Sequence, residues 1–401
     1  MRRPARLVAA LALAALLLTG CWDRREIEDV GFVMAVGLDK AKEKALALTV
    51  QIAIPRNITV SAGGGAGGGG GGASGEKPPV LVQTVEADSI TEALRDLETL
   101  VNRRVSFVHT LVVIFGKELA KDDIAPHLGI LTRFRQFRRG MMVMVAEERA
   151  AEILTTRPRL EENPAVFLED LTRRAHERTA RAPRVDLHHF LLPYESLAQE
   201  PVMPIVRLHT ASPGLEHKTL QKAQLEGTAV FKGGRMVGEL TGDESEMFLV
   251  LTDQTRAFVE TVPRRTKNGK IALEVTVEGT ETKVSLQGGR PSLSVSIVTE
   301  AELREIQGEA PEIVTIDGLR ELEERVAGQL TTRANALVKK LQTEMKVDIV
   351  GFGHSVRGRF IDWPAWEAYN WPKRFPETKI EVSVKTMIRR VGMTFQTPDR
   401  N

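Results

Sequence analysis

The chain has a single cysteine, Cys21, and its thiol is the most distinctive reactive group in the sequence. Because there is no second cysteine, Cys21 has no disulfide partner within the chain. It follows Leu18-Thr19-Gly20, which ends an apolar run that starts at Leu7, and three arginines precede that run. Basic residues, a short apolar run and a small-residue site are typical of an export signal that is removed by cleavage.

The four residues Leu18-Thr19-Gly20-Cys21 resemble the bacterial lipobox. That resemblance implies transfer of a diacylglycerol to the Cys21 sulfur, removal of residues 1–20, and long acyl chains such as palmitate on the mature protein. An ordinary secretory signal with an incidental cysteine is the alternative. Two acyl chains hold a protein firmly, because each buried methylene contributes about 0.8 kcal/mol. We therefore expect a chain tethered to the outer face of a membrane, with no other apolar run of the roughly 18 residues needed to span one.

Histidines and acidic residues supply little catalytic or metal-binding chemistry. His188-His189 is the only histidine pair, and adjacent residues on a strand point to opposite faces, so we predict no metal site and no cofactor. His109 lies in an apolar segment predicted to be a strand, where a hydrogen-bonded core or edge histidine is expected. The sequence has no Gly-x-Ser-x-Gly, HExxH or Walker motif, and its acid pairs, such as Glu323-Glu324, lie in charged helical segments. We predict that the protein is not an enzyme.

Two clusters of residues are candidates for a partner or ligand surface. The first is the basic stretch 133–139, with Arg133, Arg135, Arg138 and Arg139. It could meet anionic headgroups or an acidic partner, or it could be a solvated helix end whose Phe134 and Phe137 pack inward. The second is the aromatic stretch 363–371, with Trp363, Trp366 and Trp371. Such clusters occur at interfaces and in ligand cages, and packing over the last sheet is the structural alternative.

Composition narrows the class of protein. The chain of 401 residues is 42% hydrophobic and 27% charged, which suffices for two or three cores. There are 55 Lys and Arg against 53 Asp and Glu; without the three arginines of the signal these become 52 and 53, a net charge of −1. A nearly neutral chain argues against nucleic acid as a partner, because nucleic-acid binding depends on neutralising phosphates.

Hydrophobic periodicity predicts a multi-domain α+β fold, in which mixed and antiparallel sheets pack with helices. Alternating strands and helices precede residue 200, whereas Ile271, Leu273, Val275 and Val277 alternate as in an antiparallel strand. The pair Asp243 and Glu246 predicts the start of a short apolar helix. The predicted organisation is a signal peptide at 1–20, an N-terminal α/β domain at 21–199 with a glycine-rich loop at 61–75, a connector at 200–222, a small middle domain at 223–265, and a C-terminal α+β domain at 266–401 with a long helix at 316–346.

Several motifs, in order along the chain, resemble the Ger(x)C family. The first are Gly20-Cys21-Trp22-Asp23-Arg24-Arg25-Glu26-Ile27 and Val33-x-Ala35-x-Gly37-Leu38-Asp39. Further matches are Ser89-Ile90-x-Glu92-Ala93, Phe107-x-His109, Val112-Val113-Ile114-Phe115-Gly116, Arg133, Ala150-x-Glu152-Ile153-Leu154, Gly227 to Phe231, Asp348-x-x-Gly351-Phe352-Gly353 and Trp363-Pro364-x-Trp366. The resemblance covers nearly all of the chain after Cys21, and the glycine run is its main departure.

Members of that family are spore-germination lipoproteins, the C subunits of nutrient germinant receptors. The resemblance implies a non-enzymatic role in nutrient-triggered germination, beside the integral-membrane A and B subunits. It also implies a place on the outer face of the spore inner membrane, held by diacylglycerol on Cys21. Two alternatives remain at this point. A solute-binding lipoprotein of a transporter usually has two doubly wound lobes, and a lipid-anchored envelope enzyme needs a catalytic cleft.

Overall fold

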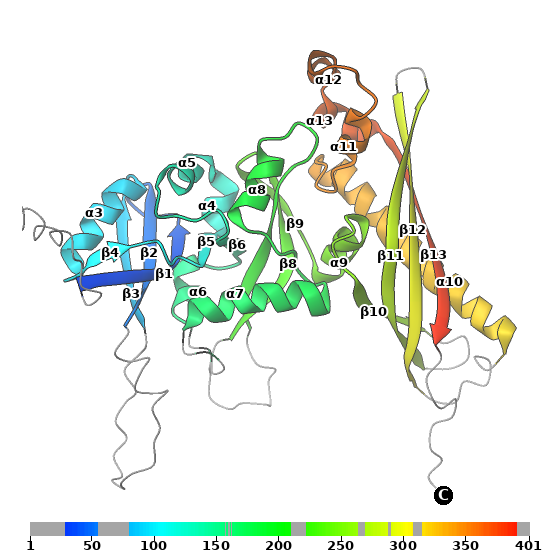
Figure 1. The fold of residues 1–401 in the computed structure, drawn as a ribbon, viewed down its shortest axis with the longest axis horizontal. Helices are drawn as coiled ribbons and strands as arrows, with labels where there is room; N and C mark the ends of the chain where they lie inside the picture. Colours follow the sequence, from blue (N-terminus) through cyan, green and yellow to red (C-terminus); the bar gives the residue numbers. More distant parts are fainter. Residues whose placement is uncertain are drawn as a thin grey trace, which may run out of the picture.

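A computed structural model of the chain describes residues 29–54, 80–156, 158, 161, 163–209, 222–263, 269–287, 290–307 and 315–390. The predicted signal peptide, Cys21 and the glycine-rich stretch at 61–75 lie outside the described residues. The described residues form two β-sheets, which lie at opposite ends of the long axis in Figure 1.

The first sheet contains nine of the described strands, in the order β3-β2-β1-β5-β6-β7-β8-β9, with β4 beside β1. Their bounds are β1 Val30–Asp39, β2 Leu46–Ala53, β3 Val80–Ala87, β4 Arg104–Ser106, β5 Val112–Gly116, β6 Met142–Ala146, β7 Val202–His209, β8 Lys222–Lys232 and β9 Arg235–Leu240. Neighbours in the series β1-β5-β6-β7 are parallel, and the outer strands are antiparallel. Every residue of β5 and β6 is buried, as expected for parallel strands covered on both faces.

Helices cover the two faces of the first sheet. On one face lie α3 Ile90–Leu100, α4 Lys117–Asp122, α5 Ala125–Arg133 and α8 Leu187–Tyr194. On the other face lie α6 Ala150–Leu154 and α7 Pro164–Arg174, the latter continued by the π-helical turn η2 Ala175–Thr179. Each set packs its buried side chains into a separate hydrophobic cluster, so the sheet has a core on both sides.

The second sheet has the strand order β10-β11-β12-β13. Its strands are β10 Ala257–Pro263, β11 Lys270–Gln287, β12 Arg290–Ile306 and β13 Lys379–Arg390. The three-strand part β10-β11-β12 is antiparallel, and β13 is parallel to β12. One face is buried, as the alternation in β12 shows, and it is covered by the long helix α10 Ile316–Lys340.

Side chains of α10 also bind both outer strands of this sheet. The Asn335 amide donates to the Val382 carbonyl at 2.8 Å and accepts from the Val382 N–H at 3.1 Å, on β13. On β10, the Arg325 guanidinium donates to the Pro263 carbonyl at 3.0 Å. These bonds occupy backbone groups that an edge strand would otherwise leave open for pairing with another chain.

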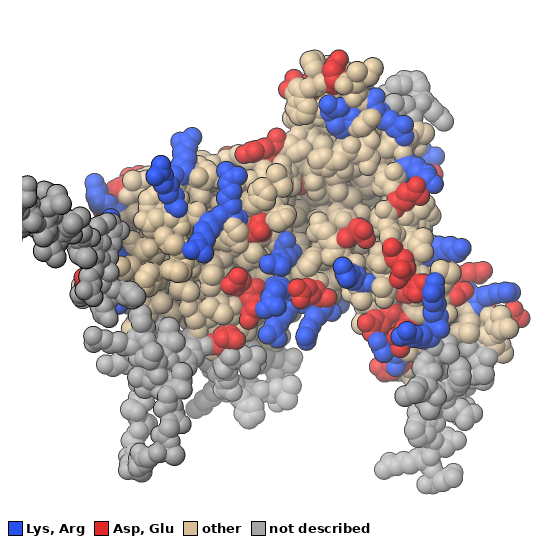
Figure 2. Space-filling view, viewed as in Figure 1, with Lys and Arg blue, Asp and Glu red and all other residues tan. Residues whose placement is uncertain are grey.

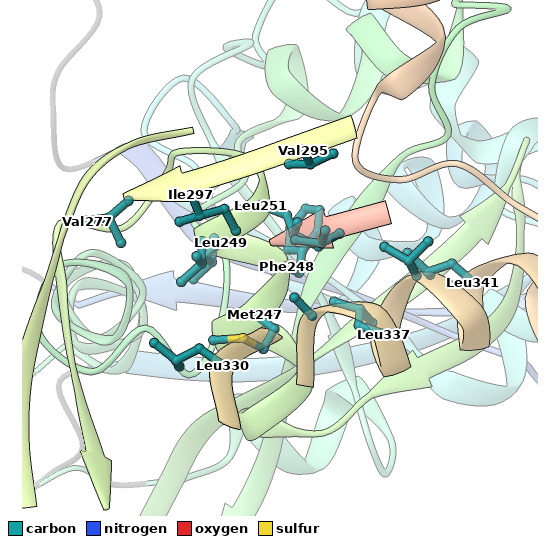
Figure 3. Packing of buried hydrophobic residues seen from close by; sticks show 14 of the residues in the cluster. Met247, Phe248, Leu249, Leu251, Val277, Val295, Ile297, Leu330, Leu337 and Leu341 are labelled. Carbon is teal, nitrogen blue, oxygen red and sulfur yellow. The ribbon is translucent and has the colours of Figure 1, made fainter. Parts of the chain in front are cut away.

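The helix α9 Gly242–Leu251 joins the two halves of the molecule. All residues from Ser245 to Leu251 are buried, as expected for a helix surrounded by core on every side. Figure 3 shows its apolar side chains against the second sheet and α10. The labelled residues are Met247, Phe248, Leu249 and Leu251 of α9, Val277, Val295 and Ile297 of the sheet, and Leu330, Leu337 and Leu341 of the long helix and its continuation.

The predicted α+β class and the predicted long helix are confirmed. Helix α10 continues through the π-helical turn η4 Leu341–Met345 and ends at Lys346, whose φ of 56° is left-handed. The remaining helical segments, α11 Phe352–Arg357, α12 Trp363–Tyr369, α13 Trp371–Arg374 and η5 Phe375–Glu377, lie between α10 and β13.

The structure divides residues 200–265 differently from the prediction. The predicted connector at 200–222 contains β7, which pairs with both β6 and β8. The predicted middle domain at 223–265 is split, because β8 and β9 complete the first sheet whereas β10 opens the second. Local alternation identifies a strand but not its pairing partner, and here the partners lie in different sheets.

Two local predictions are also wrong. The apolar segment around His109, predicted to be one strand, is interrupted between β4 and β5, where His109 lies exposed in a turn. Helix α9 is capped by Thr241, whose hydroxyl forms the capping box with the Glu244 carboxylate, rather than by Asp243 and Glu246 as predicted. Glu246 is buried instead.

Candidate functional site

Motif residues from three separate stretches meet around Asp39, at the end of β1. The Asp39 carboxylate, 2% exposed, accepts from the N–H of Ala150 at 2.7 Å and of Ala151 at 3.0 Å, in the first turn of α6. Gly37 lies under the same helix, where a Cβ would stand 3.1 Å from the Ala150 Cβ. A Cβ at Gly116 would collide with the Asp39 carboxylate. These motif residues therefore hold α6 against the first sheet.

A second set of motif residues meets around Asp348, between α10 and α11. Its carboxylate is buried and accepts from the N–H of Gly351 at 2.8 Å, the N–H of Gly353 at 2.8 Å and the Trp371 indole N–H at 3.0 Å. Burial raises the pKa of the Asp348 carboxyl to about 6, and these N–H donors oppose the rise because they favour the charged form.

The Asp348 centre also connects the second half of the molecule to the segment before β7. The Asp348 carbonyl accepts from the Glu200 N–H at 2.8 Å, and the Gln199 amide donates to the Ile349 carbonyl at 2.8 Å. A Cβ at Gly353 would collide with the Ala198 carbonyl and with the Trp371 indole, so this approach requires glycine. A small pocket beside it has room for about one water molecule.

The Asp348→Asn variant is expected to change how stability depends on pH. The folded-state pKa of about 6 lies above the usual 3.8, so Asp348 contributes most stability below pH 4 and loses that contribution as the pH rises through 6. The variant cannot titrate there. Its deficit in unfolding free energy relative to the parent should therefore shrink by up to about 3 kcal/mol between pH 4 and pH 7. Urea unfolding at several pH values measures this, and a deficit that is constant with pH would contradict the assignment.

The three predicted tryptophans fall into two groups. Trp366 and Trp371 are 2% and 1% exposed, and they pack inside the core of the second half. Trp363, the first residue of α12, is 51% exposed, and the Arg357 guanidinium lies 5.8 Å from its ring centroid. The structure thus confirms packing for two of the three and leaves Trp363 at the surface.

The four predicted arginines lie at the end of α5 and in the turn that follows it. Arg133, Arg135, Arg138 and Arg139 are all exposed, and none forms an ion pair with any described carboxylate. Phe134 and Phe137 pack inward against Phe107, with ring centroids 6.2 and 5.2 Å away. Figure 2 shows basic side chains gathered on the surface in the region of α5. The turn therefore combines an apolar anchor with a basic outer face.

The histidines are placed differently from the prediction. His188 and His189 lie on α8 rather than on a strand, with ring centroids 5.6 Å apart, and His189 Nδ1 lies 2.7 Å from the Asp186 carboxylate. His109 contacts the Phe32 ring edge-on at 5.1 Å. In the described part of the chain, no three His, Cys, Asp or Glu side chains come together as a metal site would require. None of its helices is long and apolar enough to cross a membrane.

One buried charged cluster was not predicted from the sequence. The Arg333 guanidinium of α10 reaches Glu246 of α9 at 2.8 Å and also binds Glu260 of β10, and both carboxylates are at least 95% buried. The burial of Glu260 could have been predicted, because the alternation in Phe258-x-Glu260-x-Val262 places Glu260 on the buried face of the strand. The arginine that joins it is 73 residues away, and no local pattern identifies it.

Comparisons with known proteins match both halves of the chain. The model for the spore germination protein N-terminal domain matches residues 23–208, and the model described as "Spore germination B3/ GerAC like, C-terminal" matches residues 226–392. Spore germination protein KC of Bacillus subtilis (strain 168) is 29% identical over 98% of this chain and 97% of its own length. Spore germination protein B3 of the same organism is 24% identical, over 94% and 95%.

A solved structure has the same fold. The crystal structure of the GerBC protein matches with a TM-score of 0.53 and 19% identity, and the match covers 88% of this chain and 96% of that one. With two family models that together span most of the sequence, the chain belongs to the GerAC, or Ger(x)C, family of spore germination proteins.

Proposed function

We propose that this chain is a non-enzymatic lipoprotein subunit of a germinant receptor and is required for nutrient-triggered spore germination. The observation that supports this most directly is the match of both family models, in order, along one chain. The motif residues Asp39 and Asp348 support the non-enzymatic part of the proposal, because their carboxylates hold structural elements together through hydrogen bonds.

The proposed partners are the integral-membrane A and B subunits of the receptor, with no nucleic acid involved. The proposed location is the outer face of the spore inner membrane, where diacylglycerol on Cys21 holds the chain. Support comes from the lipobox-like sequence ahead of Cys21. The outer surface also carries features suited to contacts, namely the basic turn after α5 and the exposed Trp363.

The Cys21→Ala variant is expected to abolish the response of spores to the nutrient that this receptor senses. Without the thiol there is no site for the acyl chains, and the chain is lost from the membrane. Dipicolinate release measures the response, over a panel of nutrients, in intact, gene-deleted and Cys21→Ala spores. The matched control is Trp22→Phe, which leaves the lipobox unchanged and should release dipicolinate normally.

The outcomes separate the parts of the proposal. A nutrient-specific loss that is shared by the deletion and by Cys21→Ala supports a tethered receptor subunit. A loss in the deletion alone keeps the receptor role and removes the need for the anchor. Normal release in all strains, including strains that lack related receptors, contradicts the proposal.

A further inference from the structure

The segment 357–374, here called the tip, projects from the second half of the molecule at the upper right of Figure 1. It runs from the end of α11 through α12 and α13. Its outer loop carries large apolar side chains in the open: Ile361 is 100% exposed and Trp363 is 51% exposed. Pro364 and Ala365, which follow, are exposed as well. Soluble surfaces rarely gather such residues unless they meet a partner or a membrane.

A packed base holds these apolar side chains outward. Beneath the loop, the Phe360 ring contacts Trp366 at 5.5 Å and Tyr369 at 4.8 Å between centroids. The Asp362 carboxylate accepts from the Ala365 N–H at 2.8 Å and thereby starts α12. The exposure of Ile361 and Trp363 is therefore part of a stable arrangement.

Basic residues surround the apolar loop and lack acidic partners. They are Arg357, Arg359, Lys373 and Arg374, all within the tip. None of them forms an ion pair with a described carboxylate; three instead donate to backbone carbonyls, those of Phe360, Val284 and Tyr369. A carbonyl satisfies one N–H of a guanidinium but leaves its charge uncompensated. The tip also carries two exposed carboxylates, Asp362 and Glu367. Figure 2 shows Lys and Arg side chains on the projecting region at the top, together with acidic side chains at its outermost point.

We propose that the tip inserts Ile361 and Trp363 into the interfacial layer of an anionic phospholipid membrane. Tryptophan suits that layer because its ring is apolar and its N–H can stay hydrated. The surrounding cations complement the phosphate groups of the lipid heads. An acidic protein surface offers charge but no apolar layer for a fully exposed isoleucine, so the lipid surface fits both features.

This inference rests on the proposed anchoring at Cys21, and it adds a second point of attachment. Strand β1, the first described strand after Cys21, lies at one end of the long axis in Figure 1, whereas the tip lies at the top of the other half of the molecule. Attachment at both points would turn the upper side of the molecule in Figure 1 toward the membrane. The basic turn after α5 lies on the same upper side of Figures 1 and 2 as the tip, so it would face the same surface.

Depth-dependent fluorescence quenching of the full acylated chain in vesicles tests the tip. The vesicles contain phosphatidylcholine with or without phosphatidylglycerol, and their acyl chains are brominated. All chains carry Trp22→Phe, because Trp22 adjoins the anchor. Trp366 and Trp371 are buried, so Trp363 is the tryptophan that lipid can reach. We expect quenching of its emission in anionic vesicles, at least twofold stronger than in vesicles of phosphatidylcholine alone, and its loss in Ile361→Asp.

The matched control is Ile316→Asp, at an isoleucine that is 72% exposed at the start of α10, away from the tip. It should leave the quenching unchanged. Flotation with the vesicles measures membrane binding through the anchor, separately from the tip. Quenching is measured at saturating lipid, so that insertion of the tip can be detected even in a chain without acyl groups. Flotation without quenching overturns the tip proposal, leaves the anchor intact and points to a protein surface as the occupant. Quenching that Ile361→Asp does not reduce also overturns it.

Discussion

Replacing Arg333 by methionine is expected to lower the free energy of unfolding by about 3 to 5 kcal/mol. Arg333 is the cation that faces two buried carboxylates, Glu246 at 5% and Glu260 at 2% side-chain exposure. Removing it leaves both without their positive partner inside the core, and the cost of an unpaired buried charge is large. Urea unfolding of the full chain measures the loss.

The loss in the Arg333→Met variant should depend on pH. Burial raises the pKa of the Glu246 and Glu260 carboxyls, and the Arg333 charge opposes that rise. Without the arginine the folded-state pKa values rise further above the unfolded ones. Stability that is present at low pH is then lost as the pH rises through these values, so the deficit is larger at pH 7 than at pH 4.

Two controls separate the buried cluster from a general effect of lost charge. Replacing all three members by methionine, as Arg333→Met with Glu246→Met and Glu260→Met, should recover most of the loss, because no unpaired charge remains. Arg304→Met breaks a pair on the same sheet whose partners, Arg304 and Glu274, are 52% and 40% exposed. It should leave the unfolding midpoint nearly unchanged. If Arg333→Met and Arg304→Met lost equal amounts of unfolding free energy, the loss could not be assigned to the unpaired buried carboxylates.

Replacing Trp371 by alanine is expected to cost about 3 to 5 kcal/mol of unfolding free energy. The indole is 1% exposed and packs against Phe375, with ring centroids 5.8 Å apart. Its N–H also donates to the buried Asp348 carboxylate at 3.0 Å. The substitution therefore opens a cavity and removes a hydrogen-bond donor from a buried acceptor. Thermal or urea unfolding checks the result.

The matched variant is Trp363→Ala, eight residues earlier in the same cluster. Because Trp363 is 51% exposed, its loss should change the unfolding free energy by no more than about 0.5 kcal/mol. Trp371→Phe keeps part of the ring volume but removes the N–H, so it isolates the hydrogen bond and should cost about 1 to 3 kcal/mol. Similar losses of unfolding free energy for Trp363→Ala and Trp371→Ala would contradict the assignment of Trp363 to the surface and Trp371 to the core.

Family identity and much of the secondary structure could be read from the sequence. Motif order along the chain identified the Ger(x)C family, and both family models confirm it. Strict alternation predicted β11, and hydrophobic periodicity predicted α10, because these patterns are local consequences of which face is buried. The proposed anchoring at Cys21 also depends only on neighbouring residues.

The tertiary structure alone decided which distant strands and side chains contact one another. Local patterns placed β7, β8 and β9 outside the first domain, whereas their hydrogen bonds place them in the first sheet. The same holds for side chains: Trp363, Trp366 and Trp371 are alike in the sequence, and only their packing separates an exposed tip from a core. Arg333 meets Glu260 across 73 residues. Burial and pairing depend on which surfaces the folded chain brings together, and residue type and spacing do not encode that contact locally.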